Sequence, residues 1–170
     1  MISYANLITF SCFHKQWLFK DSHLYHRFIE NLDTYRSCSN FHVYAYVIMP
    51  NHVHLISSLT SDKEGIAVLG RVKRAFSKEA IPYLQSHYPQ VMELVLSDQK
   101  TSPIPRFWQV GRGYWKPLKD VDAFHAMAMY IHENPIRRRF VERAEEWQWS
   151  SAGYYLREKE GLIKMDQVVE

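Results

Sequence analysis

The sequence predicts an α+β protein with the ferredoxin-like split-βαβ arrangement, a βαββαβ antiparallel sheet, followed by an added C-terminal helix. Three observations lead to this fold class. Some stretches alternate apolar and polar residues as strands do, whereas others repeat apolar residues at helical spacing. Their order along the chain is strand, helix, strand, strand, helix, strand, helix. Only Pro50 and Asn51 separate the second strand from the third, which requires an antiparallel hairpin.

The first half of the chain contains a strand, a helix and the hairpin. The alternating stretch LITFSCF predicts the first strand over residues 7–13. Asp21 or Ser22 can cap the first helix, whose apolar stripe is Leu24, Phe28, Leu32 and Tyr35. The second and third strands are expected over residues 41–49 and 52–59.

The second helix is expected over residues 65–80, with Ile66, Leu69, Val72 and Phe76 as its apolar stripe. Pro82 should end it or closely follow its end, because a proline inside a helix removes a hydrogen bond. Residues 83–105 show no clear period and predict a loop or a short insertion. A fourth strand, interrupted by Gly111 and Gly113, is expected next over residues 106–118.

The third helix is capped by Asp120 and carries the apolar stripe Phe124, Ala128 and Ile131. Pro135 disfavours helical geometry at Asn134, so the helix is expected to end there. His132 is expected on the protein surface. Ser150 and Ser151 lack a neighbouring base and are interpreted as a helix cap or turn.

Length and composition limit the class of protein. The chain of 170 residues suits one domain, expected over residues 1–155 with residues 156–170 as a C-terminal tail. A hydrophobic content of 46% excludes a disordered chain. Cys12 and Cys38 lie far apart without a paired motif, and the N-terminal apolar run is too short to span a membrane. These features predict a cytoplasmic protein without a membrane segment.

The positive residues are clustered, although the formal net charge is only +3. The three clusters are Arg71, Lys73, Arg74 and Lys78; Arg137, Arg138 and Arg139; and Arg106, Arg112, Lys116 and Lys119. A solvated surface is the ordinary explanation of any single cluster. Three clusters around one candidate site favour a polyanionic partner.

Two histidines stand in the apolar stretch VIMPNHVHLI. Side chains alternate along a strand, so His52 and His54 should share one face, about 7 Å apart along the strand. Imidazole has a reference pKa of about 6.5 and is available as a neutral ligand at pH 7. The pair could therefore hold a metal ion, act as acid and base, or serve as structural or surface histidines.

The third helix supplies candidate partners for this pair. Tyr130 and Asn134 are four residues apart and should share one helical face. Asn134 offers an amide oxygen, and Tyr130 a hydroxyl nucleophile. Two imidazoles and one amide oxygen would make an open site suited to Mg²⁺ or Mn²⁺. A helix C-cap is the alternative role of Asn134.

Three motifs together, VIMPNHVHLI, YIHENPIRR and WQWSSAGYY, resemble those of the HUH single-tyrosine transposases, and specifically the REP-associated tyrosine transposase (RAYT) branch. The resemblance covers the chain from Leu7 to Tyr155. It implies a metal-dependent single-stranded DNA endonuclease and strand transferase. Metal would be held by His52, His54 and Asn134, and Tyr130 would form a 5′-phosphotyrosine intermediate.

The resemblance also implies a partner, single-stranded DNA with hairpin or palindromic repeats, and a monomer or a homodimer. The expected DNA-binding residues are Arg71, Lys73, Arg74, Lys78, Arg112, Lys116, Arg137 and Arg138. Trp108, Tyr114 and Trp115 could stack on unpaired bases, although each could instead be a core residue. Two alternatives stay open: a hairpin-binding module with a decayed site, and a metal phosphodiesterase that uses water.

The chain departs from the family pattern in two places. Relatives usually carry glycine and then an aliphatic residue where Arg139 and Phe140 stand here. They often carry an acidic residue where Trp115 stands. The geometry after the third helix is therefore expected to differ.

Overall fold

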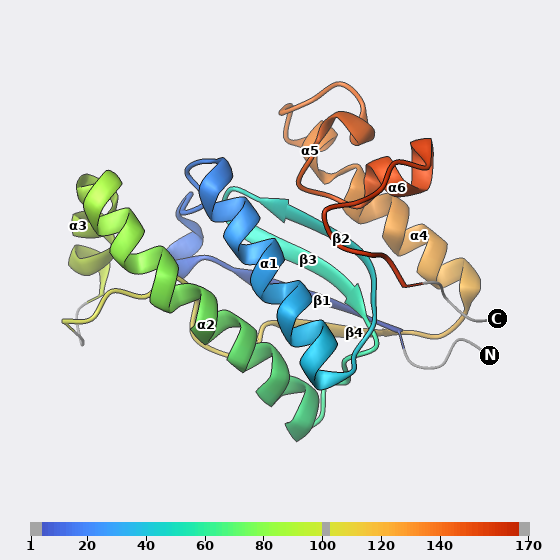
Figure 1. The fold of residues 1–170 in the computed structure, drawn as a ribbon, viewed down its shortest axis with the longest axis horizontal. Coiled ribbons are helices and arrows are strands. Elements are labelled where there is room, and N and C mark those ends of the chain that lie inside the picture. The colour runs from blue at the N-terminus through green and yellow to red at the C-terminus, as the bar shows by residue number, and fades with distance from the viewer. Residues whose placement is uncertain (1–4, 100–102, 167–170) are drawn as a thin grey trace.

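The computed structural model describes residues 5–99 and 103–166, and in this part of the chain the strands form one antiparallel sheet in the order β2-β3-β1-β4 (Figure 1). The strands are β1 (Ala5–Ser11), β2 (Val43–Met49), β3 (His52–Ser57) and β4 (Tyr114–Leu118). The helices are α1 (Ser22–Ser39), α2 (Lys63–His87), α3 (Pro89–Asp98), α4 (Val121–His132), α5 (Asn134–Arg137) and α6 (Ala152–Arg157). Short 3-10 turns are η1 (Phe13–Lys15) and η2 (Ala144–Glu146). The predicted α+β class is confirmed.

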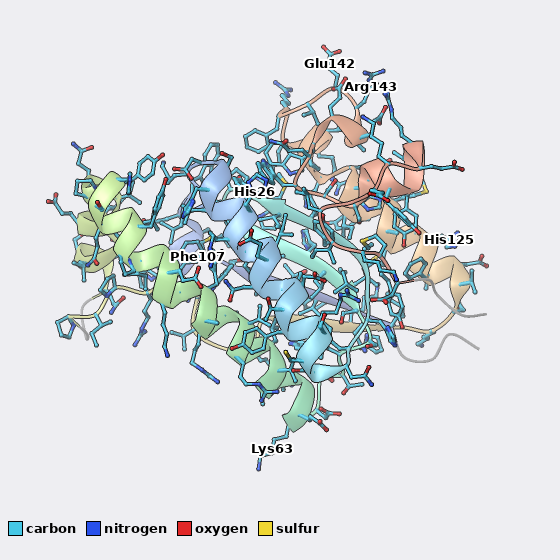
Figure 2. The ribbon with its side chains drawn as sticks, viewed as in Figure 1. His26, Lys63, Phe107, His125, Glu142 and Arg143 are labelled. Atoms are coloured by element: carbon cyan, nitrogen blue, oxygen red, sulfur yellow. The ribbon has the colours of Figure 1, made fainter. Side chains whose placement is uncertain are left out.

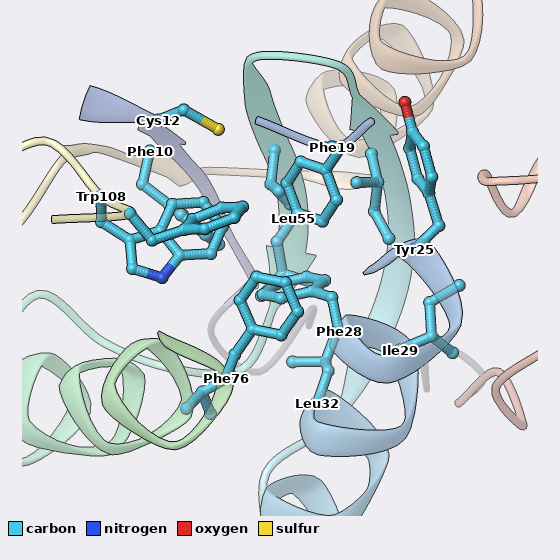
Figure 3. Close-up of a cluster of buried hydrophobic side chains, with 14 of the residues drawn as sticks. Phe10, Cys12, Phe19, Tyr25, Phe28, Ile29, Leu32, Leu55, Phe76 and Trp108 are labelled. Carbon is cyan, nitrogen blue, oxygen red and sulfur yellow. The ribbon is translucent and has the colours of Figure 1, made fainter. Parts of the chain in front are cut away.

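Each face of the sheet is covered by helices. On one face, Val53 and Leu55 of β3 are buried in a cluster with Phe28 of α1 and Phe76 of α2 (Figure 3). On the opposite face, α4 packs its buried side chains on the sheet. The predicted stripe of Phe124, Ala128 and Ile131 makes this contact, which is confirmed. His52 and His54 alternate with Val53 and Leu55, so they lie on the α4 side.

Helix α2 does not end at Pro82, and the sequence-based prediction was wrong there. Pro82 is exposed, so the carbonyl that loses its partner lies where water can reach it. The following turn is held from outside the helix. Leu84 is completely buried, and the Tyr83 hydroxyl donates to the carboxylate of Asp21. These contacts offset a proline penalty of about 3 kcal/mol.

The predicted loop over residues 83–105 was also wrong, because it contains the end of α2 and the whole of α3. Pro89 occupies the first turn of α3, where its missing N–H has no helical partner to lose. Met92 and Val95, three residues apart, are buried. A proline followed by apolar residues at this spacing is the signal that could have revealed the helix.

Smaller differences concern the ends of elements. β1 stops at Ser11, because Phe13 enters the η1 turn and His14 has a left-handed φ of 49°. β4 is shorter than predicted and begins at Tyr114, after two glycines with positive φ. Helix α4 ends at His132, and Asn134 opens α5 rather than capping α4.

The segment that follows α5 covers the outer edge of β2. Val47 forms an antiparallel bridge with Ser150, and Ile48 N donates to the Trp149 carbonyl at 2.8 Å. The Trp147 indole donates to the Ile48 carbonyl at 3.0 Å. The motif WQWSS therefore satisfies backbone groups that an edge strand would otherwise expose.

The end of the described chain also packs on the domain, because Ile163 and Met165 belong to the cluster under α1 and α2. The division at residue 155 stays a prediction. None of the helices in the described ranges combines the length and apolar character needed to cross a bilayer.

Asp21 joins three helices, and its removal should be costly. Its carboxylate accepts from Leu24 N at the start of α1, from the Tyr83 hydroxyl and from the Tyr88 hydroxyl, at 3.3, 2.9 and 2.6 Å. We expect Asp21→Ala to lower the free energy of unfolding by about 2–4 kcal/mol, because it removes a cap and two charge-assisted bonds. Urea denaturation at pH 7 measures this loss.

The matched control is Asp120→Ala. Asp120 also caps a helix, but the hydrogen bond to its side chain comes from Ala123 N, at 2.7 Å. Its loss should be about 1 kcal/mol. Equal losses in the two variants would contradict the role given to the tyrosine contacts of Asp21.

Candidate active site

The two histidines of β3 lie side by side on the α4 face of the sheet. Their ring centroids are 4.8 Å apart. Thr9 of β1 stands opposite His54 in the sheet, and the Thr9 hydroxyl lies 2.7 Å from His54 Nδ1. Asn51 Oδ1 lies 2.6 Å from His52 Nδ1. When each Nδ1 is engaged in this way, each Nε2 is left to face the site as a potential ligand.

Both imidazoles are held in the neutral form. Burial, assisted by the charges of Arg138 and Lys15, lowers the pKa of His52 to about 4. Burial, followed by the effects of His52 and Arg137, lowers the pKa of His54 to about 3. At pH 7 both rings therefore carry a lone pair that can bind a cation.

Tyr130 of α4 and Asn134 of α5 lie beside the two histidines, around one cavity. A cavity of about 240 Å³, here called the site cavity, is lined by Ser11, Lys15, Asn51, His52, His54, Tyr130, Asn134 and Arg138. Asn134 is buried, with Nδ2 at 3.4 Å from His52 Nε2. Tyr130 is 46% exposed, and its ring centroid lies 6.1 Å from that of His54. Four predicted site residues are thus brought together around one cavity.

Arg137 fixes the orientation of Tyr130. Its guanidinium carbon lies 4.3 Å from the centre of the Tyr130 ring, and Nη2 donates to the Tyr130 carbonyl oxygen. Glu133 accepts from the same guanidinium at 3.2 Å. Glu133 itself is exposed. A cation stacked on the phenol ring holds it in place without blocking its hydroxyl.

Most of the predicted DNA-binding residues are exposed: Arg71, Arg74, Lys78, Arg112, Lys116, Arg137 and Arg138. Lys73 is different, because its ammonium group lies 5.6 Å from the centre of the Phe10 ring and 3.4 Å from the Gly111 carbonyl oxygen. Burial lowers the pKa of Lys73. Lys73 therefore braces the loop before β4 in addition to carrying charge.

The aromatic candidates separate in the same way. Trp108 is buried among the rings of Phe10, Phe28 and Phe76, so its role is in the core (Figure 3). Tyr114 is 59% exposed, whereas Trp115 is partly buried.

Sequence reasoning missed Thr9, Asn51 and Lys15. Thr9 and Asn51 could have been found, because Thr9 lies in the neighbouring strand and Asn51 is adjacent to His52. Lys15 could not, since its place depends on two consecutive left-handed residues, His14 and Lys15, with φ of 49° and 55°.

The prediction that His132 lies on the surface was wrong, because its exposed fraction is only 5%. It follows the buried Ala128 by one helical turn, and the segment on the β2 edge covers it. His132 Nε2 lies 2.8 Å from the Ser151 hydroxyl, and Ser151 Oγ accepts from Tyr46 N at 2.9 Å. This bond ties α4, two residues beyond Tyr130, to the edge of the sheet. The prediction that Ser151 lacks a neighbouring base was therefore wrong, because the His132 ring lies beside its hydroxyl.

The buried histidines should make the metal-free protein sensitive to acid. Burial lowers the pKa of His132 to about 4, from an ordinary value of 6.5. The unfolded chain therefore binds protons first, and stability is lost as the pH falls from about 6.5 towards 4. Each such histidine should lower the free energy of unfolding by up to about 1.4 kcal/mol for each pH unit in this range.

His52 and His54 have lowered pKa values as well. His132→Gln should therefore remove about a third of the total change in unfolding free energy per pH unit. Urea denaturation of the metal-free protein at several pH values measures it. A slope that is the same in the variant and the wild type would contradict this assignment.

Arg139 marks the predicted departure after the third helix. It adopts a left-handed conformation with φ of 60°, which a glycine would take without strain. The backbone therefore takes a turn that suits a glycine, at a cost of about 1–2 kcal/mol for an arginine. The expected difference in geometry from relatives stays a prediction. The side chain of Arg139 is exposed and extends beside the site.

The comparisons with known proteins bear on the fold. No family model matches the chain. No curated protein matches it either. Among solved structures, a REP-associated tyrosine transposase bound to a REP hairpin aligns with a TM-score of 0.68 and 14% identity, over 100% of this chain and 90% of that chain. The chain has the fold of that transposase.

A second solved structure, a candidate transposase from Deinococcus radiodurans R1, aligns over 76% of this chain and 88% of its own. Its TM-score is 0.47 at 14% identity, too low to establish a common fold.

The donor set at the site is mixed. Within residues 5–99 and 103–166, no three His, Cys, Asp or Glu side chains are grouped so that they could hold a metal ion. A metal at the site cavity would therefore need the amide of Asn134 beside the two imidazoles. Rotation of that amide by 180° would direct its oxygen, rather than its nitrogen, towards the same point. Two imidazoles, an amide and open positions suit a divalent cation such as Mn²⁺ or Mg²⁺.

Proposed function

We propose that the chain is a metal-dependent DNA transposase of the HUH single-tyrosine type, which cleaves and rejoins single-stranded DNA. The observation that carries the proposal is the convergence of His52, His54, Asn134 and Tyr130 on the site cavity. The shared fold with a REP-associated tyrosine transposase supports it. By the same analogy, the substrate would be a strand with hairpin or palindromic repeats.

The residues divide the chemistry between them. His52, His54 and Asn134 would hold Mg²⁺ or Mn²⁺, which supplies charge stabilisation to the scissile phosphate. The Tyr130 hydroxyl would attack phosphorus, the bond to the 3′ oxygen would break, and a 5′-phosphotyrosine and a 3′-hydroxyl would result. The covalent bond retains the energy of the phosphodiester, so the strand can be rejoined without ATP.

The surroundings of the site suit this substrate. Lys15 and Arg138 line the site cavity, and Arg137 lies against Tyr130. Positive side chains would bind the phosphates and neutralise charge that develops during phosphoryl transfer. The exposed cations of α2 and the β4 region, Arg71, Arg74, Lys78, Arg112 and Lys116, would bind the DNA backbone further out.

The test is a search for a covalent adduct. The full chain is incubated with Mn²⁺ or Mg²⁺ and a pool of labelled hairpin-flanked single strands, followed by a denaturing gel and peptide mass spectrometry. We expect a metal-dependent DNA–protein adduct on the peptide that contains Tyr130. Cleavage without an adduct would favour a water-using phosphodiesterase instead. Binding without cleavage would favour a hairpin-binding module with a decayed site.

A further inference from the structure

A second cavity, of about 220 Å³, adjoins the site cavity and is here called the neighbouring cavity. It is lined by Trp17, Met49, Pro50, Asn51, His52, Arg138, Arg139 and Phe140. Asn51, His52 and Arg138 line both cavities. A ligand that extends out of the site cavity past these residues would therefore enter the neighbouring cavity.

The wall of this cavity is aromatic and firmly supported on one side. Phe140 packs on Trp147, with ring centroids 5.4 Å apart, and the Trp147 indole donates to the Ile48 carbonyl of β2. Trp17 meets Phe140 edge-on, at a centroid distance of 5.6 Å and an angle of 61°. Trp17 nevertheless stays 57% exposed. An indole held at one edge and open elsewhere can accept a flat ligand on its face.

The charge around both cavities has one sign. Arg138 and Arg139 line the neighbouring cavity, and Lys15 and Arg138 line the site cavity. Among the described residues that line either cavity, none is an aspartate or glutamate. Aromatic rings beside arginines, without a carboxylate, form the pattern that binds unpaired nucleotides: the ring stacks on the base, and the cation pairs with phosphate.

We propose that the neighbouring cavity binds one unpaired nucleobase of the single strand, next to the phosphate held in the site cavity. Trp17 stacks on the base, Phe140 forms the wall behind it, and Arg138 and Arg139 contact the flanking phosphates. This inference rests on the proposed function and deepens it. The pocket would help to choose which phosphate in the strand is presented to Tyr130.

The experiment pairs protein and DNA changes. The hairpin-flanked strand of the adduct assay is made with an abasic nucleotide at each position near the cleaved bond in turn. Adduct formation is measured with the wild type, and equilibrium binding is measured in the Tyr130→Phe background, which keeps the strand intact. Both are repeated with Trp17→Ala, with Trp17→Phe, and with Leu94→Ala as a control for the loss of an exposed apolar side chain on α3.

We expect Trp17→Ala to weaken binding and slow adduct formation about tenfold to a hundredfold with the intact strand. One abasic position should produce the same loss in the wild type and no further loss in Trp17→Ala. Binding and adduct formation in Trp17→Phe should be intermediate between those of the wild type and Trp17→Ala. Leu94→Ala should behave as the wild type.

The proposal is overturned if adduct formation is normal in Trp17→Ala, or if the protein and DNA changes multiply independently at every position. Either result leaves the proposed function standing. If no adduct forms with the wild type but Trp17 and one abasic position are coupled in binding, the base pocket stands and the proposed cleavage function fails.

Discussion

Replacing Tyr130 by phenylalanine should reduce DNA–protein adduct formation by at least about a thousandfold. The change removes one oxygen atom and keeps the ring, so the contact with the Arg137 guanidinium is retained. Tyr130 is 46% exposed, so the hydroxyl is not needed for the core and the variant should fold normally. Rates of adduct formation on denaturing gels, with hairpin binding measured in parallel, test this prediction.

Tyr114→Phe is the matched control, because Tyr114 is another exposed tyrosine, on β4. It should form the adduct at the wild-type rate. Adduct formation that survives in Tyr130→Phe would assign the nucleophile to another residue. A simultaneous loss of hairpin binding would show that the substitution acts on DNA recognition rather than on the attack.

Replacing either strand histidine by alanine should weaken divalent metal binding by at least about a hundredfold and remove metal-dependent cleavage. The reason is that each ring would supply one ligand, and changes to the groups that merely orient such ligands already reduce affinity 10–100-fold. Titration calorimetry with Mn²⁺ measures the affinity of His52→Ala and His54→Ala. Hairpin binding should persist, since the outer cations remain.

His125→Ala is the control for this pair. His125 lies on α4, is exposed and points to the outside of the molecule (Figure 2). Its substitution should change neither metal affinity nor cleavage. Unaltered Mn²⁺ affinity in both His52→Ala and His54→Ala would disprove the proposed metal site.

The sheet and three of its helices could be predicted because local signals agreed with tertiary packing. The caps Asp21 and Asp120 accept backbone hydrogen bonds as expected. The alternation along β3 placed His52 and His54 on one face, and Val53 and Leu55 on the other face are buried in the core. Period and capping are local properties, so a single sequence contains them.

The passage of α2 through Pro82 could not be predicted with the same rules. A proline penalty is local, whereas its compensation by Asp21 comes from the start of another helix. His132 was misplaced for a related reason. Its partner Ser151 lies in a segment that pairs with β2, and no periodicity in α4 reports that contact.

The candidate site residues were proposed from the spacing of His52 and His54 within β3 and from the four-residue spacing of Tyr130 and Asn134. Their convergence depended on the register of β1 and β3 and on the turn from α4 into α5, neither of which the spacing defines. The neighbouring cavity was not foreseeable. It requires Trp17 from the chain after η1 to meet Phe140 from the chain after α5, more than a hundred residues later.

The two borders of the sheet affect how copies of the chain could associate. The outer side of β2 is occupied by the segment around Ser150. At the opposite border, β4 contains Lys116 and Pro117, residue types that oppose the addition of another strand. Edge-to-edge aggregation is therefore discouraged on both sides. A homodimer would have to form through helices or loops, and not by extending the sheet from one copy into the next.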